Sequence, residues 1–423
     1  MKRIWDVTRQ SSFLRQNAVF FLGSVGVGLL NYAYYPVMSH LLPVSSYGEV
    51  QAIMSLFLQL LIFLTVLGQV TVNVVANYQD ETKKQKIIYE LEKLALFLSI
   101  ALFIVAAVFG WKIKSFFHFN SVSPFLILML SIVVTVPLAF RSAYLRGHKK
   151  FASVAAANLL SSASEIIISA VLVLVGWKTA GAVFGIVVAQ FLAFLYAARA
   201  AYKIGFTKPE NAKLASLPDV KTLRPELMYG LLVLCGSLTI TVLSSADIFV
   251  VKHYFDAQTA GHYAGVSTVA RIIFFLTASI AQVLLPSVKI NQTAKHNRML
   301  FLKSLALVLT LGGMAALVFA VFQREIITVL MGKKYLTYGH LLGRLSLLML
   351  VLSVLNLVIS YFVALRKYSI IIIVLLGASL TFGLLAIFHT TLQAVIDSVL
   401  SGALAMLGMF GVWLIISKVI KKE

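Results

Sequence analysis

The chain has 423 residues, of which 60% are hydrophobic and only 12% are charged, and its mean hydropathy is +0.94. These values exclude a water-soluble globular protein, because soluble domains usually contain about 25% charged residues. The formal net charge of +21 would indicate nucleic-acid binding in a soluble protein, so the positions of the basic residues decide its interpretation.

Apolar runs of about 20 residues follow one another along the whole chain. An α-helix of this length crosses the roughly 30 Å of hydrocarbon in a bilayer. We therefore expect an all-α polytopic membrane protein with about twelve transmembrane helices. In chain order the spans are expected at 17–38, 52–76, 94–110, 124–142, 154–176, 180–199, 228–251, 267–288, 301–322, 342–364, 369–388 and 395–417.

The basic residues alternate between rich and poor segments along this series of spans. The two termini and every second loop together hold 27 of the 36 Lys and Arg residues, the other loops hold seven, and Arg271 and Arg344 fall within spans. Because cytoplasmic segments carry the excess of Lys and Arg, both termini are expected in the cytoplasm. Most of the positive charge is therefore an orientation signal, and we expect no nucleic-acid partner.

The longest loop divides the chain into two halves. Residues 202–227 are charged and carry three prolines, so they indicate a cytoplasmic linker between an N-lobe at 1–201 and a C-lobe at 228–423, each with six spans. At an offset of 213, residues 18–75 align with 231–288 without a gap, and the matched pairs include Gly48 with Gly261. The spans of the two segments start on the same side, so the sequence predicts a parallel repeat about an axis along the membrane normal.

Several spans carry polar residues at helical spacing. A polar side chain in hydrocarbon is costly unless it faces protein or water, so these stripes predict surfaces that face an interior cavity. The repeat places Asn31 at the position of Ser244, as two lobes around one cavity would require. Hydrogen bonding between helices is the alternative, because small and polar residues commonly provide it in membranes. The polar candidates are Ser24, Asn31, Gln69, Asn158, Ser162, Ser244 and Gln282.

Three ionisable residues within spans are the strongest site candidates. Glu165 lies near the middle of its span, where it should be protonated, paired or facing water. Asp247 and Arg271 flank the loop between the seventh and eighth spans at similar depth, so they could form an ion pair. Arg344 and Asp397 could form a second pair. Each pair could also be purely structural, and a Glu165 bonded to neighbouring serines is an alternative to a functional acid.

No pattern in the sequence indicates a catalytic site, a metal site or a cofactor. Cys235 is the one cysteine, which excludes an internal disulfide and a cysteine-based metal cluster. The eight histidines are scattered without metal-ligand spacing. We expect a protein that is not an enzyme.

Two segments carry a resemblance to a known family. Residues 17–50, NAVFFLGSVGVGLLNYAYYPVMSHLLPVSSYGEV, resemble the start of the polysaccharide transporter branch of the multidrug, oligosaccharidyl-lipid and polysaccharide exporter superfamily, through their Asn, Gly-Ser and Leu-Pro-x-x-x-Tyr-Gly elements. The segment SSADIFVVKHYFDAQTAGHYAGVSTVARII is similar to that family's seventh and eighth helices, with Asp247, Gly261–Tyr263 and Ala270–Arg271 at the recurring positions. Glu49 departs from the pattern, since an aromatic residue often follows the glycine there.

This resemblance implies a Wzx-type flippase of the bacterial inner (plasma) membrane. Its substrate would be an undecaprenyl-diphosphate-linked oligosaccharide, a polysaccharide precursor that moves from the cytoplasmic to the outer leaflet by alternating access. Its partners would be this polyprenyl-diphosphate-linked oligosaccharide and the lipid bilayer, with the polysaccharide polymerase and assembly machinery open as protein partners. A cation-coupled drug exporter of the same superfamily would instead use Glu165 or Asp247 for ion coupling. A membrane-embedded glycan polymerase or ligase would usually need a sizeable outer loop, which the sequence lacks.

Overall fold

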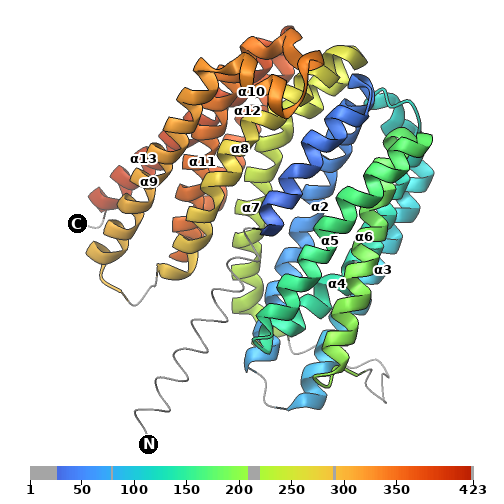
Figure 1. The fold of residues 1–423 in the computed structure, drawn as a ribbon. Helices are drawn as coiled ribbons and strands as arrows, with labels where there is room; N and C mark the ends of the chain where they lie inside the picture. Colours follow the sequence, from blue (N-terminus) through green and yellow to red (C-terminus); the bar gives the residue numbers. More distant parts are fainter. Residues whose placement is uncertain (1–25, 78–79, 208–219, 289–291, 421–423) are drawn as a thin grey trace, which may run out of the picture. The chain divides into compact units, whose positions relative to one another are not determined.

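The computed structural model describes residues 26–77, 80–207, 220–288 and 292–420, and these residues form helices joined by short connections, with no strand among them (Figure 1). A helix at residues 26–41 comes first. The expected spans coincide with helices throughout, except that residues 17–25 of the first span lie outside the described residues. The elements that follow are α2 (Val44–Asn77), α3 (Glu81–Phe116), α4 (Ser123–Gly147), α5 (Phe151–Leu172), the π-helix η1 (Val173–Trp177), α6 (Lys178–Tyr202), α7 (Val220–Tyr254), α8 (Ala257–Ser287), α9 (Ala294–Val321), α10 (Gln323–Leu330), the 3₁₀-helix η2 (Lys333–Leu341), α11 (Leu342–Ala364), α12 (Ile370–Ile387) and α13 (Leu392–Ile420).

Ten helical stretches of the described residues are long and apolar enough to cross a membrane. One of them, Phe151–Tyr202, contains α5, η1 and α6, in which the chain turns at Gly176 with a φ of 100° that favours glycine. The helix at 26–41 is not one of the ten stretches, because its described part is shorter than a membrane-spanning helix. The prediction of an all-α, multi-pass membrane protein with about twelve spanning helices is therefore confirmed.

The helices group into two compact units. The first contains residues up to Leu42 and Phe63–Glu226, and the second contains Pro43–Ile62 and the chain from Leu227 onward. The boundary near residue 226 lies at the end of the expected linker. The first part of α2 belongs to the second unit, although in the sequence it lies well before the linker. Dividing the chain at the linker would place all of α2 in the first unit. The division into lobes at 1–201 and 228–423 stays a prediction, as does the parallel repeat.

Small and hydroxyl-bearing residues bring the helices of the first unit together. Ser169 on α5 donates a hydrogen bond of 2.8 Å to the Ala182 carbonyl on α6, and a Cβ on Gly185 would lie 2.1 Å from the Ser169 hydroxyl oxygen. Thr135 on α4 bonds to the Gln190 side chain on α6. In a bilayer, where the hydrophobic effect does not drive helices together, such close backbone approach and interhelical hydrogen bonds stabilise packing.

The second unit uses the same devices. Thr277 on α8 donates a hydrogen bond of 2.7 Å to Ser353 on α11. The start of α2 approaches α8 so closely that a Cβ on Gly261 would lie 2.1 Å from the Val44 carbonyl oxygen, and a Cβ on Gly48 would lie 2.8 Å from the Gly261 Cα. The two glycines that the internal alignment matches therefore pack against each other.

Candidate functional site

Asp247 of α7 is the acceptor at the centre of a buried polar network in the second unit. Its carboxylate accepts hydrogen bonds from Tyr263 Oη and Ser267 Oγ, both at 2.9 Å, and from Arg271 Nη2 at 3.2 Å. The Asp247 side chain is 1% exposed and the Arg271 side chain 11%. We call these four residues the Asp247 network.

The sequence of α8 explains why the three donors meet one carboxylate. Residues 263, 267 and 271 are spaced by four, so they lie on one face of α8, and all three donate hydrogen bonds to Asp247 on α7. Asp256 fixes the start of α8, because its side chain accepts hydrogen bonds of 3.0 Å from the backbone N–H groups of Gln258 and Thr259. The α7–α8 connection is thus short and well defined, and it sets the depth at which Asp247 faces Arg271.

The expected pairing of Asp247 with Arg271 is confirmed. Sequence reasoning missed Tyr263 and Ser267 as members of the network, although their spacing from Arg271 is the signal that could have revealed them. Arg271 Nε is buried and has no hydrogen-bond partner among the described residues. The guanidinium therefore has an N–H group, that of Nε, which no described residue uses, and whether it serves a substrate stays a prediction.

A second pair of opposite charges is buried in the same unit. Glu49 on α2 and Lys252 on α7 are each 2% exposed, and the Glu49 carboxylate acts electrostatically on the Lys252 ammonium group. Glu49, which departs from the family pattern, is thus an acidic residue whose charge is compensated by the buried Lys252. Charge compensation of this kind is required at such depth, because an isolated buried charge is strongly destabilising.

The polar residues of the fifth span lie within the first unit. Ser162 on α5 donates a hydrogen bond of 2.6 Å to Asn31 Oδ1 and also contacts the backbone carbonyl of Asn158, whose own side chain is exposed. Glu165 is half-buried and lies near the buried Tyr34. Asn31, Ser162 and the residues around Glu165 therefore form one polar surface on α5 and the helix at 26–41.

Tyr34 ties this surface to α6. Its hydroxyl donates a hydrogen bond of 3.2 Å to the Ala182 carbonyl, the same carbonyl that accepts from Ser169. Tyr34 is 1% exposed, so its ring fills the space beside Glu165. Sequence reasoning did not single out Tyr34, because a tyrosine in an apolar run gives no signal of its own.

The positions of the four remaining polar candidates give no evidence of a shared site. Ser24 is outside the described residues, and the side chains of Gln69 on α2 and Gln282 on α8 are exposed. Ser244 on α7 is half-buried, and its hydroxyl donates to a backbone carbonyl one turn earlier in its own helix, at 2.9 Å. A role of these four residues in substrate binding stays a prediction.

The second expected ion pair also forms. Arg344 Nη1 lies 2.9 Å from Asp397 Oδ2, and the two side chains are 50% and 51% exposed. This pair is therefore an accessible counterpart of the buried Asp247–Arg271 pair. No group of three potential metal-ligating side chains gathers in the part of the chain that the structure describes.

Comparison with solved structures shows the fold. The lipid II flippase MurJ in an inward closed conformation matches with a TM-score of 0.72 at 16% identity, over 93% of this chain and 87% of that chain. An inward-facing multidrug resistance MATE family transporter of the MOP superfamily matches with a TM-score of 0.74 at 14% identity, over 93% and 96%. A MOP superfamily transporter from Pyrococcus furiosus matches with a TM-score of 0.66 at 15% identity, over 97% and 96%.

Sequence comparison shows the family. None of the curated proteins is significantly similar to the chain. The family model described as polysaccharide biosynthesis protein matches residues 13–292, which is more than half of the chain. This match places the chain in the polysaccharide biosynthesis protein family.

Proposed function

We propose that the protein is a flippase of the inner (plasma) membrane that moves an undecaprenyl-diphosphate-linked oligosaccharide from the cytoplasmic to the outer leaflet by alternating access, with both termini in the cytoplasm. The observation that carries the proposal is the buried guanidinium of Arg271, whose Nη2 donates to Asp247 while its Nε has no hydrogen-bond partner among the described residues. The polysaccharide family match and the flippase and transporter folds support the same function class.

The substrate explains why such a protein needs polar groups inside the membrane. A lipid-linked oligosaccharide can keep its tail in the bilayer, but its diphosphate and hydroxyl groups lose their hydrogen bonds to water in hydrocarbon. Each such group needs a partner during translocation. An inside-negative membrane potential favours outward transfer of an anionic headgroup by about 2.3 kcal/mol per charge per 100 mV, so the proposal does not require a coupling ion.

Arg271 has the chemistry for the diphosphate. A guanidinium can donate two parallel hydrogen bonds to a phosphate, and it stays protonated even when buried. Asp247 holds one edge of the group and neutralises its charge when no substrate is bound. Tyr263 and Ser267 donate to the same carboxylate, so Asp247 keeps hydrogen-bond partners when the substrate takes over the guanidinium. The network can therefore alternate between a closed ion pair and a substrate-bound state.

Transport by Arg271 variants tests the proposal. Purified protein in proteoliposomes would be given a fluorescent polyprenyl-diphosphate-linked disaccharide, and the fraction reaching the opposite leaflet would be measured per folded molecule. We expect Arg271→Lys to retain part of the transport and Arg271→Ala little of it. Full transport by the double variant Asp247→Ala/Arg271→Ala would show that Arg271 does not contact the substrate, and would refute this role.

Glu165 supports a second candidate, a cation-coupled exporter of small molecules. A half-buried carboxyl beside the buried Tyr34 is a group that could exchange a proton or a cation during transport. The MATE transporters that share the fold are described as multidrug resistance proteins. Increased sensitivity of a deletion strain to toxic organic cations, with normal surface polysaccharide, would favour this candidate over the flippase.

A further inference from the structure

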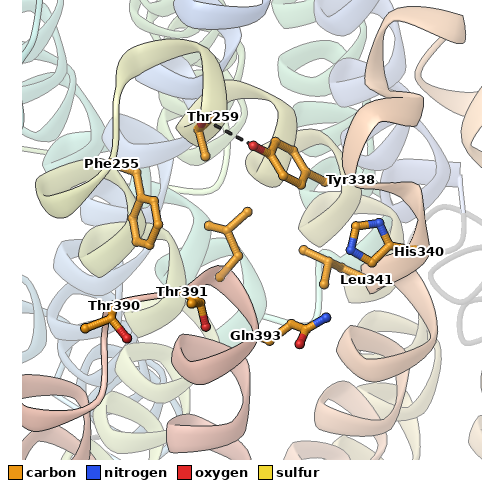
Figure 2. Close-up of a pocket in the computed structure, with 9 residues that line it drawn as sticks. Phe255, Thr259, Tyr338, His340, Leu341, Thr390, Thr391 and Gln393 are labelled. Carbon is orange, nitrogen blue, oxygen red and sulfur yellow. Dashed lines mark hydrogen bonds between the residues drawn. The ribbon is translucent and has the colours of Figure 1, made fainter.

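The second unit has an open pocket of about 350 Å³ away from the Asp247 network. Its walls come from the end of α7, the first turn of α8, the 3₁₀-helix η2 and the turn between α12 and α13. Figure 2 shows the side chains of these segments around a common space. The lining residues are Phe255, Thr259, Tyr338, His340, Leu341, Thr390, Thr391, Leu392 and Gln393.

The walls of the pocket are fixed by contacts outside it. The Tyr254 ring at the end of α7 stacks on the His389 ring at 3.7 Å between centroids, which holds the α12–α13 turn against α7. The η2 segment is anchored by Tyr335, whose ring packs on α8 so closely that a Cβ on Gly265 would lie 2.2 Å from it. Thr259 Oγ1 lies 3.4 Å from Tyr338 Oη and joins α8 to η2 across the pocket (Figure 2). A site built on such elements is largely preformed.

The chemistry of the lining is that of a site for neutral, hydroxyl-rich molecules. None of the nine residues carries a carboxylate, an ammonium or a guanidinium group. Three threonines, a tyrosine, a histidine and a glutamine provide groups that include both donors and acceptors, as sugar hydroxyls require. The rings of Phe255 and Tyr338 offer apolar faces for the C–H surface of a sugar ring. The volume is near the lower limit of about 300 Å³ for small-molecule sites, which fits a short saccharide.

The pocket is lined by the connection between α7 and α8 and by the connection between α12 and α13. These two connections lie at the same end of the second unit (Figure 1). In the orientation that the basic residues predict, this is the outer side of the membrane. Thr259 and Arg271 are both on α8, twelve residues and therefore about 18 Å apart along the helix axis. An oligosaccharide of a few units covers this distance, so a diphosphate at Arg271 and sugar units at the pocket are compatible in length.

We propose that this pocket is a saccharide-binding subsite that engages neutral sugar units of the transported lipid-linked oligosaccharide on the outer side of the membrane. The inference rests on the proposed function and adds where the sugar part is recognised. The pocket holds the glycan while the network holds the diphosphate, so the two ends of the headgroup are bound by two separate parts of one unit.

Saturation-transfer difference NMR with the full-length protein in nanodiscs tests binding directly, because it detects weak ligands. The probes are free neutral disaccharides built from glucose, galactose, mannose or N-acetylglucosamine. We expect saturation transfer from the wild-type protein to at least one of them. The variant Gln393→Leu/Thr390→Val, which removes an amide and a hydroxyl from exposed positions, should bind that probe about fivefold more weakly or worse, the size of a lost hydrogen bond.

Gln258→Leu is the matched control. Gln258 is exposed on the same first turn of α8 as Thr259 but does not line the pocket, so its replacement should leave saturation transfer unchanged. Thr391 is left intact, because its hydroxyl accepts a hydrogen bond of 3.1 Å from the Ala394 N–H at the start of α13. Absence of saturation transfer to every probe, or equal transfer with the pocket variant, would overturn the inference.

A transport assay separates this inference from the proposed function. In proteoliposomes the pocket variant should raise the concentration of lipid-linked disaccharide needed for half-maximal flipping by about fivefold. If the variant flips normally while Arg271→Ala does not, the flippase stands and the pocket is not a subsite for the transported glycan. If neither the wild type nor any variant flips lipid-linked disaccharide, the proposed function fails, whatever the NMR result.

Discussion

Replacing Asp247 by alanine should destabilise the protein far more than replacing Asp397. Both aspartates accept from an arginine within the second unit, at 3.2 Å and 2.9 Å respectively. They differ in surroundings, since the Asp247 side chain is 1% exposed and the Asp397 side chain 51%. The comparison therefore varies burial while it keeps the chemistry of the pair.

The expected magnitude follows from what each substitution leaves behind. Asp247→Ala leaves the Arg271 charge uncompensated in a buried site and removes the acceptor of Tyr263 and Ser267. Breaking a buried ion pair from one side costs about 3–5 kcal/mol. Asp397→Ala breaks an accessible pair near the ends of α11 and α13, and such pairs contribute about 0–1 kcal/mol.

Thermal unfolding of detergent-solubilised protein measures the difference. For a unit of this size, each kcal/mol corresponds to about 2–4 °C in Tm. We therefore expect Asp247→Ala to lower Tm by about 6 °C or more, and Asp397→Ala by about 4 °C at most. The variant Asp247→Ala/Arg271→Met should recover part of the loss, because it removes the uncompensated charge and keeps apolar volume.

Equal Tm values for the Asp247 and Asp397 variants would refute the reasoning, because they would mean that burial of the pair has no energetic effect. A double variant less stable than Asp247→Ala would contradict the electrostatic cause in particular. Since Asp247→Ala is expected to lower protein abundance, its transport has to be compared per folded molecule. A loss of transport beyond the loss of folded protein would then identify a role in the transport cycle.

Other features of the structure lead to further predictions. Gly261→Ala forces a side chain against a neighbouring helix backbone and should cost about 1–3 kcal/mol of stability. Gly313→Ala should leave Tm nearly unchanged, because its Cβ would have no atom of the described residues within 4 Å, and equal effects of the two substitutions would contradict the close approach at Gly261. Hydrogen bonds from Thr259 lower the pKa of Asp256 below that of an unfolded aspartate, about 3.9. The contribution of the Asp256 cap to stability is therefore fully present above about pH 3.9 and is lost as pH falls through the lower pKa of the folded state. The Tm difference between wild type and Asp256→Ala should be present at about pH 6 and become smaller as pH falls below about 4. Glu165→Ala should reduce transport more than folding, and equal transport per folded molecule would leave the residue a packing role. A cysteine at Lys333, in a background without the native cysteine, should react with an impermeant reagent added from outside the cell, and protection there would overturn the predicted orientation.

Hydropathy and helical spacing determine where the membrane spans lie and which helix faces are polar, without information on the tertiary structure. The spans follow from the length of apolar runs, because only a helix satisfies its backbone in hydrocarbon without a partner, so helix positions need no tertiary information. The pairing of Asp247 with Arg271 could also be predicted, since a short connection between antiparallel helices places residues at equal distances from the turn side by side. For the contact between Asn31 and Ser162, the sequence predicts only that each residue lies on a polar face of its helix. Helical periodicity identifies the face but not the residue on the other helix that it contacts.

Other features depend on which helices become neighbours, and a single sequence does not encode that locally. Tyr34 finds its acceptor 148 positions away on α6, and the first part of α2 belongs to the second unit because Gly48 and Gly261 allow two backbones to approach. The pocket collects residues from four separate segments, none of which forms a recognisable motif. Local spacing thus determines the helices and their polar faces, whereas packing between distant segments determines which polar groups meet and where a pocket remains.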